Sequence, residues 1–269
     1  MKKYILILMS LAIIFTLGLS SCKKDRGDKP SLPPKESMVQ DLSLPHGNKT
    51  MQGTNADTAF TDASIRVGVW NAILFIGLVV PVGTFLDAFN HTATWSNADD
   101  AWRWKYSVGV GLLTYDVKLL GKVETDSVHW QMYVTHDGDF EDFLWYQGWS
   151  QVNDLGGRWV MYESPTKTNE LLGIYWAKNT SDNTVSIRYQ NICPPSVAPY
   201  GDDNGGYIYY GTSTGAYNRF YHIYNASNGN LAEIEWNFGD ERGRIRDSIK
   251  YGNQWACWDE SQQDCDCPN

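Results

Sequence analysis

Basic residues are scarce in this chain of 269 residues, and their scarcity excludes one class of partner. The 22 Lys and Arg stand against 31 Asp and Glu, which gives a formal net charge of −9 at pH 7. If the N-terminal segment that contains Lys2 and Lys3 is removed, 20 basic and 31 acidic residues remain, and the formal net charge becomes −11. A protein that binds nucleic acid needs a basic surface to displace counterions from phosphates. We therefore expect no nucleic-acid partner.

Residues that could form a catalytic centre are also few. The five histidines are scattered along the chain, and no pair of them has the spacing of metal ligands. Gly211-Thr212-Ser213-Thr214-Gly215 matches the nucleophile-elbow pattern, but that elbow needs a helix directly after its serine. Residues 219–224 continue with strand character instead. We predict no catalytic residues and no cofactor.

Cysteine occurs only five times, and four of the five lie in the last third of the chain: Cys193, Cys257, Cys265 and Cys267. In an oxidising compartment this even number indicates two disulfides, for which three connectivities are possible. No Cys-x-x-Cys occurs, and Cys265-Asp266-Cys267 is a poor chelate for tetrahedral zinc. We expect disulfides that attach the C-terminal tail to the domain, and no metal site.

The first 22 residues have the organisation of a bacterial lipoprotein signal. Lys2 and Lys3 precede an apolar run from Ile5 to Leu19, and Leu19-Ser20-Ser21-Cys22 has the form of a lipobox. We predict a signal peptide over residues 1–21 and lipidation of Cys22. An ordinary secretory signal or an uncleaved anchor is the alternative.

The residues around this cysteine carry a family resemblance. Ser20-Ser21-Cys22-Lys23-Lys24-Asp25 resembles the lipoprotein start of the Bacteroidota, where charged residues after the cysteine accompany transfer to the outer membrane and sometimes to the cell surface. The resemblance implies an outer-membrane lipoprotein, on the periplasmic face or the cell surface, whose N-terminal lipid binds the membrane.

Two segments that follow differ in composition. Residues 22–60 hold four prolines and no sustained apolar period, which predicts a flexible tether. Residues 64–90 are almost continuously apolar, as in a buried core helix or a transmembrane span. Because Pro81 and two glycines interrupt this run, we favour two short helices, about 64–80 and 82–90, buried in one domain over residues 61–269.

From Thr92 onward the apolar period is two, as in half-buried strands. Trp102, Trp104 and Tyr106 alternate with Arg103 and Lys105, and ten similar runs follow between residues 114 and 249. The short turns between them exclude a parallel sheet. We predict a mainly β fold, a long antiparallel up-and-down meander of about 11–12 strands. Such a sheet tends to curl into a barrel or half-barrel, with the apolar helix packed inside. By fold analogy alone it resembles lipocalins and periplasmic lipoprotein carriers.

A hairpin near the C-terminus offers the first candidate site. If Gly239-Asp240 forms a two-residue turn, Glu235 lies opposite Arg244 and Glu233 opposite Arg246. On an outer surface these are ordinary cross-strand ion pairs. Inside a barrel they form a patch that could orient a ligand carboxylate or phosphate.

Two further groups are weaker candidates. Trp149, Trp255 and Trp258 lie near strand ends or in the tail, where they either form an aromatic platform for sugars or pack against the tail. Most other tryptophans alternate within strands and are expected in the core: Trp102, Trp104, Trp130, Trp145 and Trp236. Asp137, Asp139, Glu141 and Asp142 are weak calcium candidates in a turn, for which a solvated acidic turn is the simpler interpretation.

These observations leave three hypotheses for function. The first is a membrane-anchored envelope lipoprotein that binds an apolar molecule, a glycan or a protein partner without catalysis. The second is a structural or interaction lipoprotein whose barrel is completely filled. The third is a hydrolase with an unrecognised site. A ligand-accessible void beside residues 64–90 favours the first over the second, and a cleft that joins carboxylates with a histidine favours the third.

Overall fold

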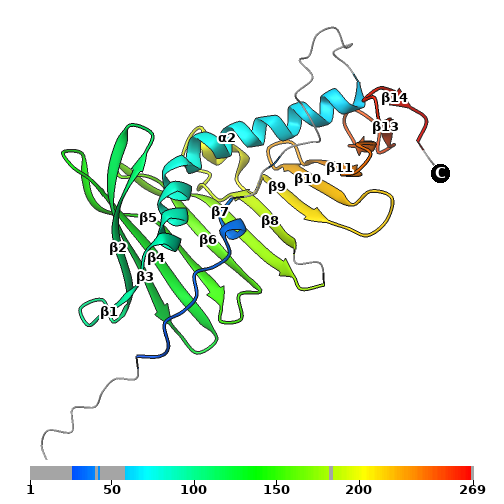
Figure 1. Cartoon of the computed structure of the whole chain (residues 1–269). Helices are drawn as coiled ribbons and strands as arrows, with labels where there is room; N and C mark the ends of the chain where they lie inside the picture. The colour runs from blue at the N-terminus through cyan, green and yellow to red at the C-terminus, as the bar shows by residue number, and fades with distance from the viewer. Residues whose placement is uncertain (1–25, 40–41, 43–57, 182–183, 268–269) are drawn as a thin grey trace, which may run out of the picture.

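The computed structural model describes residues 26–39, 42, 58–181 and 184–267 (Figure 1). Its strands form one 14-stranded sheet in which each strand pairs with its neighbours in sequence, and every pair is antiparallel. The prediction of a mainly β, antiparallel meander is confirmed. The prediction that the sheet closes into a barrel is wrong, because the strand order runs from β1 to β14 and these two end strands do not pair with each other.

The strands are β1 Thr94–Ser96, β2 Ala101–Val110, β3 Leu113–Val123, β4 Ser127–His136, β5 Phe140–Gln151, β6 Gly156–Ser164, β7 Lys167–Asn179, β8 Thr184–Asn191, β9 Tyr207–Thr212, β10 Arg219–Asn225, β11 Asn230–Trp236, β12 Gly243–Arg246, β13 Ala256–Trp258 and β14 Asp264–Cys265. The strands missed in the sequence are β1, β13 and β14, which are too short to show an alternating pattern. Short edge strands expose few unpaired backbone groups, so the open sheet has little edge on which another strand could add.

One long helix crosses the sheet. The helix α2 extends over Ala59–Asp87, and its N-cap Thr58 accepts a hydrogen bond from the Thr61 amide through its side chain. The parts Ala59–Phe75 and Gly77–Asn90 are bent by 62°. The bend lies one turn before Pro81, because proline has no N–H for the carbonyl of Gly77. Three short 3-10 helices complete the described elements: η1 Lys35–Ser37, η2 Ala88–Asn90 and η3 Tyr200–Asp203.

The two interpretations of the apolar segment can now be compared with its surroundings. Within the described ranges, no single helix has the length and composition to cross a bilayer, although the two bent parts of α2 meet that criterion when taken together. Ala63, Val67, Leu78 and Phe85 are buried against the rest of the molecule. One face of the segment is therefore part of the core, as expected for a buried helix.

The helix is fixed to the sheet near its two ends. In the first turns, Arg66 Nη2 lies 2.5 Å from Asp247 Oδ2, and Phe60 packs edge-on against Trp258 in β13. In the last turns, Tyr106 Oη of β2 donates a hydrogen bond of 2.5 Å to the Thr84 carbonyl. Figure 1 shows α2, in cyan, running across the sheet between these two regions.

This span constrains the shape of the sheet. Ten strand spacings separate β2 from β12, about 48 Å along the hydrogen-bonding direction. The 29 residues of α2 measure about 43 Å along the helix axis. The sheet therefore has to twist and curve for one helix to reach both regions, which produces a half-open inner face in place of a closed barrel.

The inner face, which we define as the sheet face turned towards α2, holds an aromatic core. Trp104, Trp130 and Trp236 are buried as expected, whereas Trp102 and Trp145 are only partly buried and pack at its margin. Trp159 and Tyr146 are almost completely buried beside them.

Part of the expected tether also belongs to this core. Ser37 and Met38 are fully buried, and Leu42 is 1% exposed. Trp159 Nε1 donates to Ser37 Oγ at 3.3 Å, and Tyr189 Oη donates to the Met38 carbonyl at 3.4 Å. The prediction of a flexible tether over residues 22–60 is therefore corrected for residues 26–39, for Leu42, and for residues 58–60, where α2 begins. A few apolar side chains anchor this stretch, although its average composition is polar.

The ion pair between Arg66 and the buried Asp247 gives the first testable prediction. Asp247 has a fully buried side chain, so Arg66→Leu leaves a carboxylate without its cation in the interior. We expect the substitution to lower the free energy of unfolding by about 3 kcal/mol or more. Chemical denaturation of the full chain measures the loss.

Lys118→Met is the matched control. Lys118 pairs with Asp142, whose side chain is 60% exposed, so its loss should cost less than about 1 kcal/mol. Equal losses in the two variants would mean that Arg66 does not fix the helix through a desolvated charge pair.

Candidate functional site

An open apolar groove lies beside the middle of α2. Its volume is about 650 Å³, within the range of roughly 300–1,000 Å³ typical of small-molecule sites. Most of its lining comes from α2, and Val39 of the N-terminal segment and Tyr189 of β8 also contribute; the apolar side chains from α2 include Leu74, Phe75, Leu78, Val79 and Val82. Asn71 is the one side-chain amide in the lining.

The groove exists because α2 is held near its ends. Its closest packing against strands involves β2, β12 and β13, and its middle turns cross the centre of the sheet without comparable contact. Leu74 and Leu78 point inwards and are 6% and 4% exposed, whereas Phe75 and Val79 form the rim and are 76% and 49% exposed. The void that would favour ligand binding therefore lies where the first hypothesis requires it.

The outward face of α2 is apolar too. Ile65, Val69 and Ile73 follow one another at intervals of four residues, and each is more than half exposed. The expectation that the apolar segment is buried in the domain is therefore met on one face only. Its composition is apolar all round, but the sheet covers only one side.

The opposite face of the sheet, which we call the outer face, has a different chemistry. A single register row crosses it from β3 to β12, with one residue from each strand paired to the next. We call this set the outer row; it consists of Lys122, His129, Trp149, Arg158, Tyr175, Arg188, Tyr209, His222, Glu233 and Arg246. Two predicted candidates, Trp149 and the Glu233–Arg246 pair, are therefore parts of one surface.

The register predicted for the C-terminal hairpin is confirmed. Glu235 lies opposite Arg244 and Glu233 opposite Arg246, with hydrogen bonds of 2.8 and 2.6 Å from the two arginine Nε atoms. The four side chains lie on the outer face, since Ile234 and Ile245 between them are fully buried. The arrangement therefore matches cross-strand ion pairs on an outer surface.

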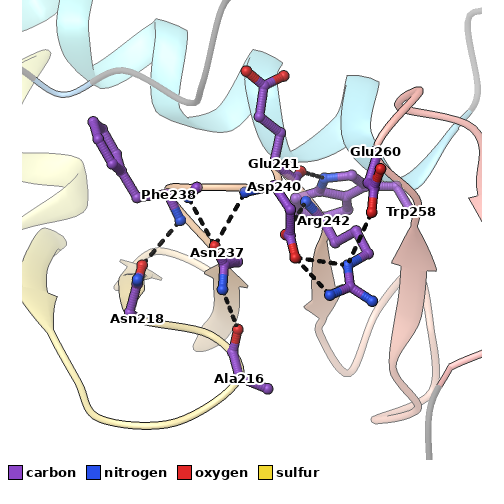
Figure 2. Close-up of polar contacts among 10 residues, drawn as sticks. Ala216, Asn218, Asn237, Phe238, Asp240, Glu241, Arg242, Trp258 and Glu260 are labelled. Atoms are coloured by element: carbon purple, nitrogen blue, oxygen red, sulfur yellow. Dashed lines mark hydrogen bonds and ion pairs between the residues drawn. The ribbon is translucent and has the colours of Figure 1, made fainter.

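The predicted turn of this hairpin is wrong. The last register pair is Trp236 with Gly243, and residues 237–242 form a longer loop. Figure 2 shows its supports: Asn237 Oδ1 accepts from the amides of Gly239 and Asp240, and Trp258 Nε1 donates to the Glu241 carbonyl. Lengthening a loop symmetrically leaves the register unchanged, which is why the pairs were still predicted correctly.

A polar hollow of about 620 Å³ adjoins this hairpin. Its lining includes Ser213, Thr214, Tyr217, Glu235 and Arg244. Ser213 Oγ donates to the Tyr217 carbonyl at 2.7 Å, and β10 follows this loop directly, without a helix. The serine therefore stabilises its own loop and lacks the surroundings of a nucleophile elbow.

The three tryptophans proposed as a sugar platform do not lie together. Trp149 stacks on His129, with ring centroids 4.6 Å apart, and the Arg158 guanidinium lies 4.6 Å from the same ring. Trp255 contacts Arg244 and Arg246 at 4.1 and 4.5 Å. Trp258 is 1% exposed and belongs to the core. Only Trp149 and Trp255 therefore reach the surface, at separate places.

The acidic turn between β4 and β5 forms ordinary surface contacts. Asp142 pairs with Lys118 at 3.0 Å, and Asp139 lies 3.6 Å from His136. Nowhere in the described ranges do three or more His, Cys, Asp or Glu side chains come together as metal ligands, and Asp137 and Glu141 add none here.

The cysteines form one disulfide among the described residues, not the two expected. Cys257 is bonded to Cys267, while Cys193 is buried and Cys265 exposed, both as free thiols. Asp264 Oδ1 in the same tail accepts from the Ala59 amide at the start of α2. The tail is thus attached to the domain as expected. Cys22, the predicted lipidation site, lies outside the described residues.

No protein-family model, no curated protein and no solved structure matches this chain. The groove residues Phe75 and Val79 were not predicted as sites, and of the outer row only Trp149, Glu233 and Arg246 were. Helical phase could have separated the two faces of α2, and strand phase the two faces of the sheet, but neither predicts which face stays uncovered.

The free thiol of Cys265 gives the second testable prediction. Although Cys265 is exposed, partial loss of hydration raises the pKa of its thiol above the ordinary value. The carboxylates of Asp259, Asp266 and Asp264 raise this pKa further, and Arg242 opposes the increase. Because a raised pKa leaves less thiolate at a given pH, Cys265 should react slowly with iodoacetamide at pH 8. Its rate should keep rising at pH values where an ordinary cysteine has levelled off.

Mass-spectrometric labelling of the chain from Lys23 onward measures this rate, and Asp266→Asn should increase it. Asp139→Asn, which removes the same charge from a distant turn, should not. If both variants accelerate labelling equally, the local carboxylates do not control the thiol.

Proposed function

We propose that this protein is a membrane-anchored envelope lipoprotein that binds an apolar molecule in the groove beside α2, without catalysis. The groove carries the proposal: it is open, about 650 Å³ in volume, and lined mainly by aliphatic and aromatic side chains. Covering such surface is favourable by roughly 25 cal/mol per Å² of apolar area. A largely exposed Phe75 at the rim gains most from a bound ligand.

The lining also narrows the class of ligand. Its aliphatic side chains offer contact area without directional hydrogen bonds, which suits a flexible hydrocarbon chain. Asn71 supplies a polar group that could meet the head of such a molecule. A lipid-like molecule with one long acyl or isoprenoid chain fits this combination best.

The second hypothesis, a filled structural domain, has one observation in its favour. Trp130, Tyr146 and Trp159 are 0–1% exposed, so the centre of the inner face has no room for a ligand. The ligand we propose therefore lies at the flank of α2, not in the middle of a barrel. No histidine or carboxylate lines this groove, which gives a hydrolase no support there.

Val79→Glu tests the proposal. A carboxylate on the groove wall must be desolvated when an apolar ligand binds, so we expect affinity for diphenylhexatriene, a neutral apolar probe, to fall at least tenfold. That change corresponds to about 1.4 kcal/mol. Fluorescence titration of the non-lipidated chain from Lys23 onward, which retains every described residue, measures it.

Ile65→Glu is the matched control on the same helix. Ile65 is 53% exposed, against 49% for Val79, but it lies outside the groove. Its probe affinity should stay within twofold of the unmodified chain. Equal losses in both variants would assign the probe to the outward face of α2, and absence of binding to the unmodified chain would favour the filled structural domain.

A further inference from the structure

We propose a second binding site on the outer face: Arg158, Tyr175 and Arg188 at the centre of the outer row bind an acidic polysaccharide chain. The three residues are consecutive register partners on β6, β7 and β8. Neighbouring strands lie about 4.8 Å apart, so the two arginines originate about 10 Å from each other with the tyrosine between them. This site is on the opposite face from the apolar groove and does not depend on it.

The two guanidinium groups are not neutralised within the described part of the chain. Arg158 lies over the Trp149 ring at 4.6 Å and Arg188 over the Tyr207 ring at 4.0 Å, and neither has a hydrogen bond or ion pair there. Five other arginines contact carboxylates: Arg66, Arg103, Arg242, Arg244 and Arg246. Of the four arginines without a carboxylate partner in the described structure, Arg26, Arg158, Arg188 and Arg219, two therefore lie on the outer row.

Ring contact prepares these arginines for an anion. Stacking on an aromatic ring orients the planar guanidinium while its N–H edge remains free for a bidentate contact with a carboxylate or sulfate. Arg188 Nε is buried without a hydrogen-bond partner in the described structure, so its terminal nitrogens are the ones available to a ligand.

Tyr175 lies flat between the two charges. A Cβ atom placed on Gly173 would come within 3.0 Å of Tyr175 Cε2, so the tyrosine ring covers this glycine. Tyr175 is nevertheless 39% exposed. A flat ring that is open on one side is the surface on which the C–H face of a sugar stacks.

The neighbouring positions contain no competing carboxylate. Across β6 to β8, the flanking rows are Val160, Gly173 and Gln190 on one side and Gly156, Ala177 and Ser186 on the other. These side chains are neutral and mostly small, so an extended chain can approach the surface. Further along the outer row, burial lowers the pKa of His222, which leaves it uncharged at neutral pH, and Glu233 neutralises Arg246.

These features favour an acidic polysaccharide over other anions. Stacked sugars occupy the tyrosine, and acid groups on the sugars to either side meet the two arginines. A nucleic acid would also stack, but it carries a phosphate at every nucleotide, and the patch offers only two cations in a chain of net charge −9. A polysaccharide whose acid groups are separated by a stacked sugar matches two arginines with a ring between them. An anionic membrane surface usually requires a cluster of four to eight basic residues, which this patch lacks.

Binding assays on the full chain in detergent test the site, with polygalacturonate and dextran sulfate as uronate and sulfate probes and neutral dextran as the reference. We expect at least one acidic polymer to bind and dextran not to bind. Arg158→Gln, Arg188→Gln and Tyr175→Ala should each weaken binding at least tenfold. Arg158→Lys should restore only part of the affinity, because lysine keeps the charge but loses the planar contact.

Arg26→Gln is the matched control, since Arg26 also lies over a tryptophan, Trp95, but at the β1 edge of the sheet and away from strands β6 to β8. Its affinity should stay within twofold of the unmodified chain. The proposal is overturned if neither acidic polymer binds, if Arg26→Gln weakens binding as much as Arg158→Gln, or if single-stranded DNA binds as tightly as the polysaccharides. Unchanged denaturation midpoints establish that the variants are folded.

Discussion

The attachment of α2 to two distant parts of the sheet is the constraint on which the remaining structure depends. At one end Arg66 pairs with the fully buried carboxylate of Asp247, and at the other Tyr106 donates to the Thr84 carbonyl. Both contacts are directional, so they fix the helix in position as well as in depth. A helix held only by apolar packing could slide, whereas this one has to cross the sheet along a single line.

Fixing α2 near its ends has consequences for its middle. The turns around Leu74 and Leu78 bridge the centre of the inner face, and η1 with Met38 fills part of the space beneath. What is left between these elements is the apolar groove. The groove is thus a geometric result of spanning a curved open sheet with a bent helix, and it needs no cavity inside the aromatic core.

The sequence predicted the features that depend on local periodicity. Alternation in residues such as Trp102 to Tyr106 was enough for the antiparallel meander, and it also placed Glu233 opposite Arg246 before the turn was known. Closure of the sheet was not predictable, because it depends on how α2 and the N-terminal segment cover the inner face. The burial of Met38 was missed because one methionine in a proline-rich stretch gives no periodic signal.

The prediction of two disulfides was wrong for a related reason. Counting cysteines assumes that each has a partner within reach, but Cys193 lies in the loop after β8 and is separated from the tail by several strands. Only the tail cysteines are neighbours. Cys257 in fact has Cys265 as its register partner while it is bonded to Cys267, so the choice depends on the path of the last residues.

Attachment of the N-terminal segment also determines how the two proposed sites would face the membrane. Gly27 lies within van der Waals reach of Val123 in β3, and Arg26 lies over Trp95 in β1, so the described chain begins at the β1 edge of the sheet. Three residues lie between Cys22 and Arg26, so the two Cα atoms are four steps apart, at most about 14 Å along an extended chain. If Cys22 is lipidated, this edge is therefore held close to the bilayer. The outer row begins in β3 and extends away from that edge as far as β12, so a polysaccharide bound at its centre would lie farther from the bilayer than the β1 edge. The groove on the opposite face of the sheet could hold its apolar ligand at the same time.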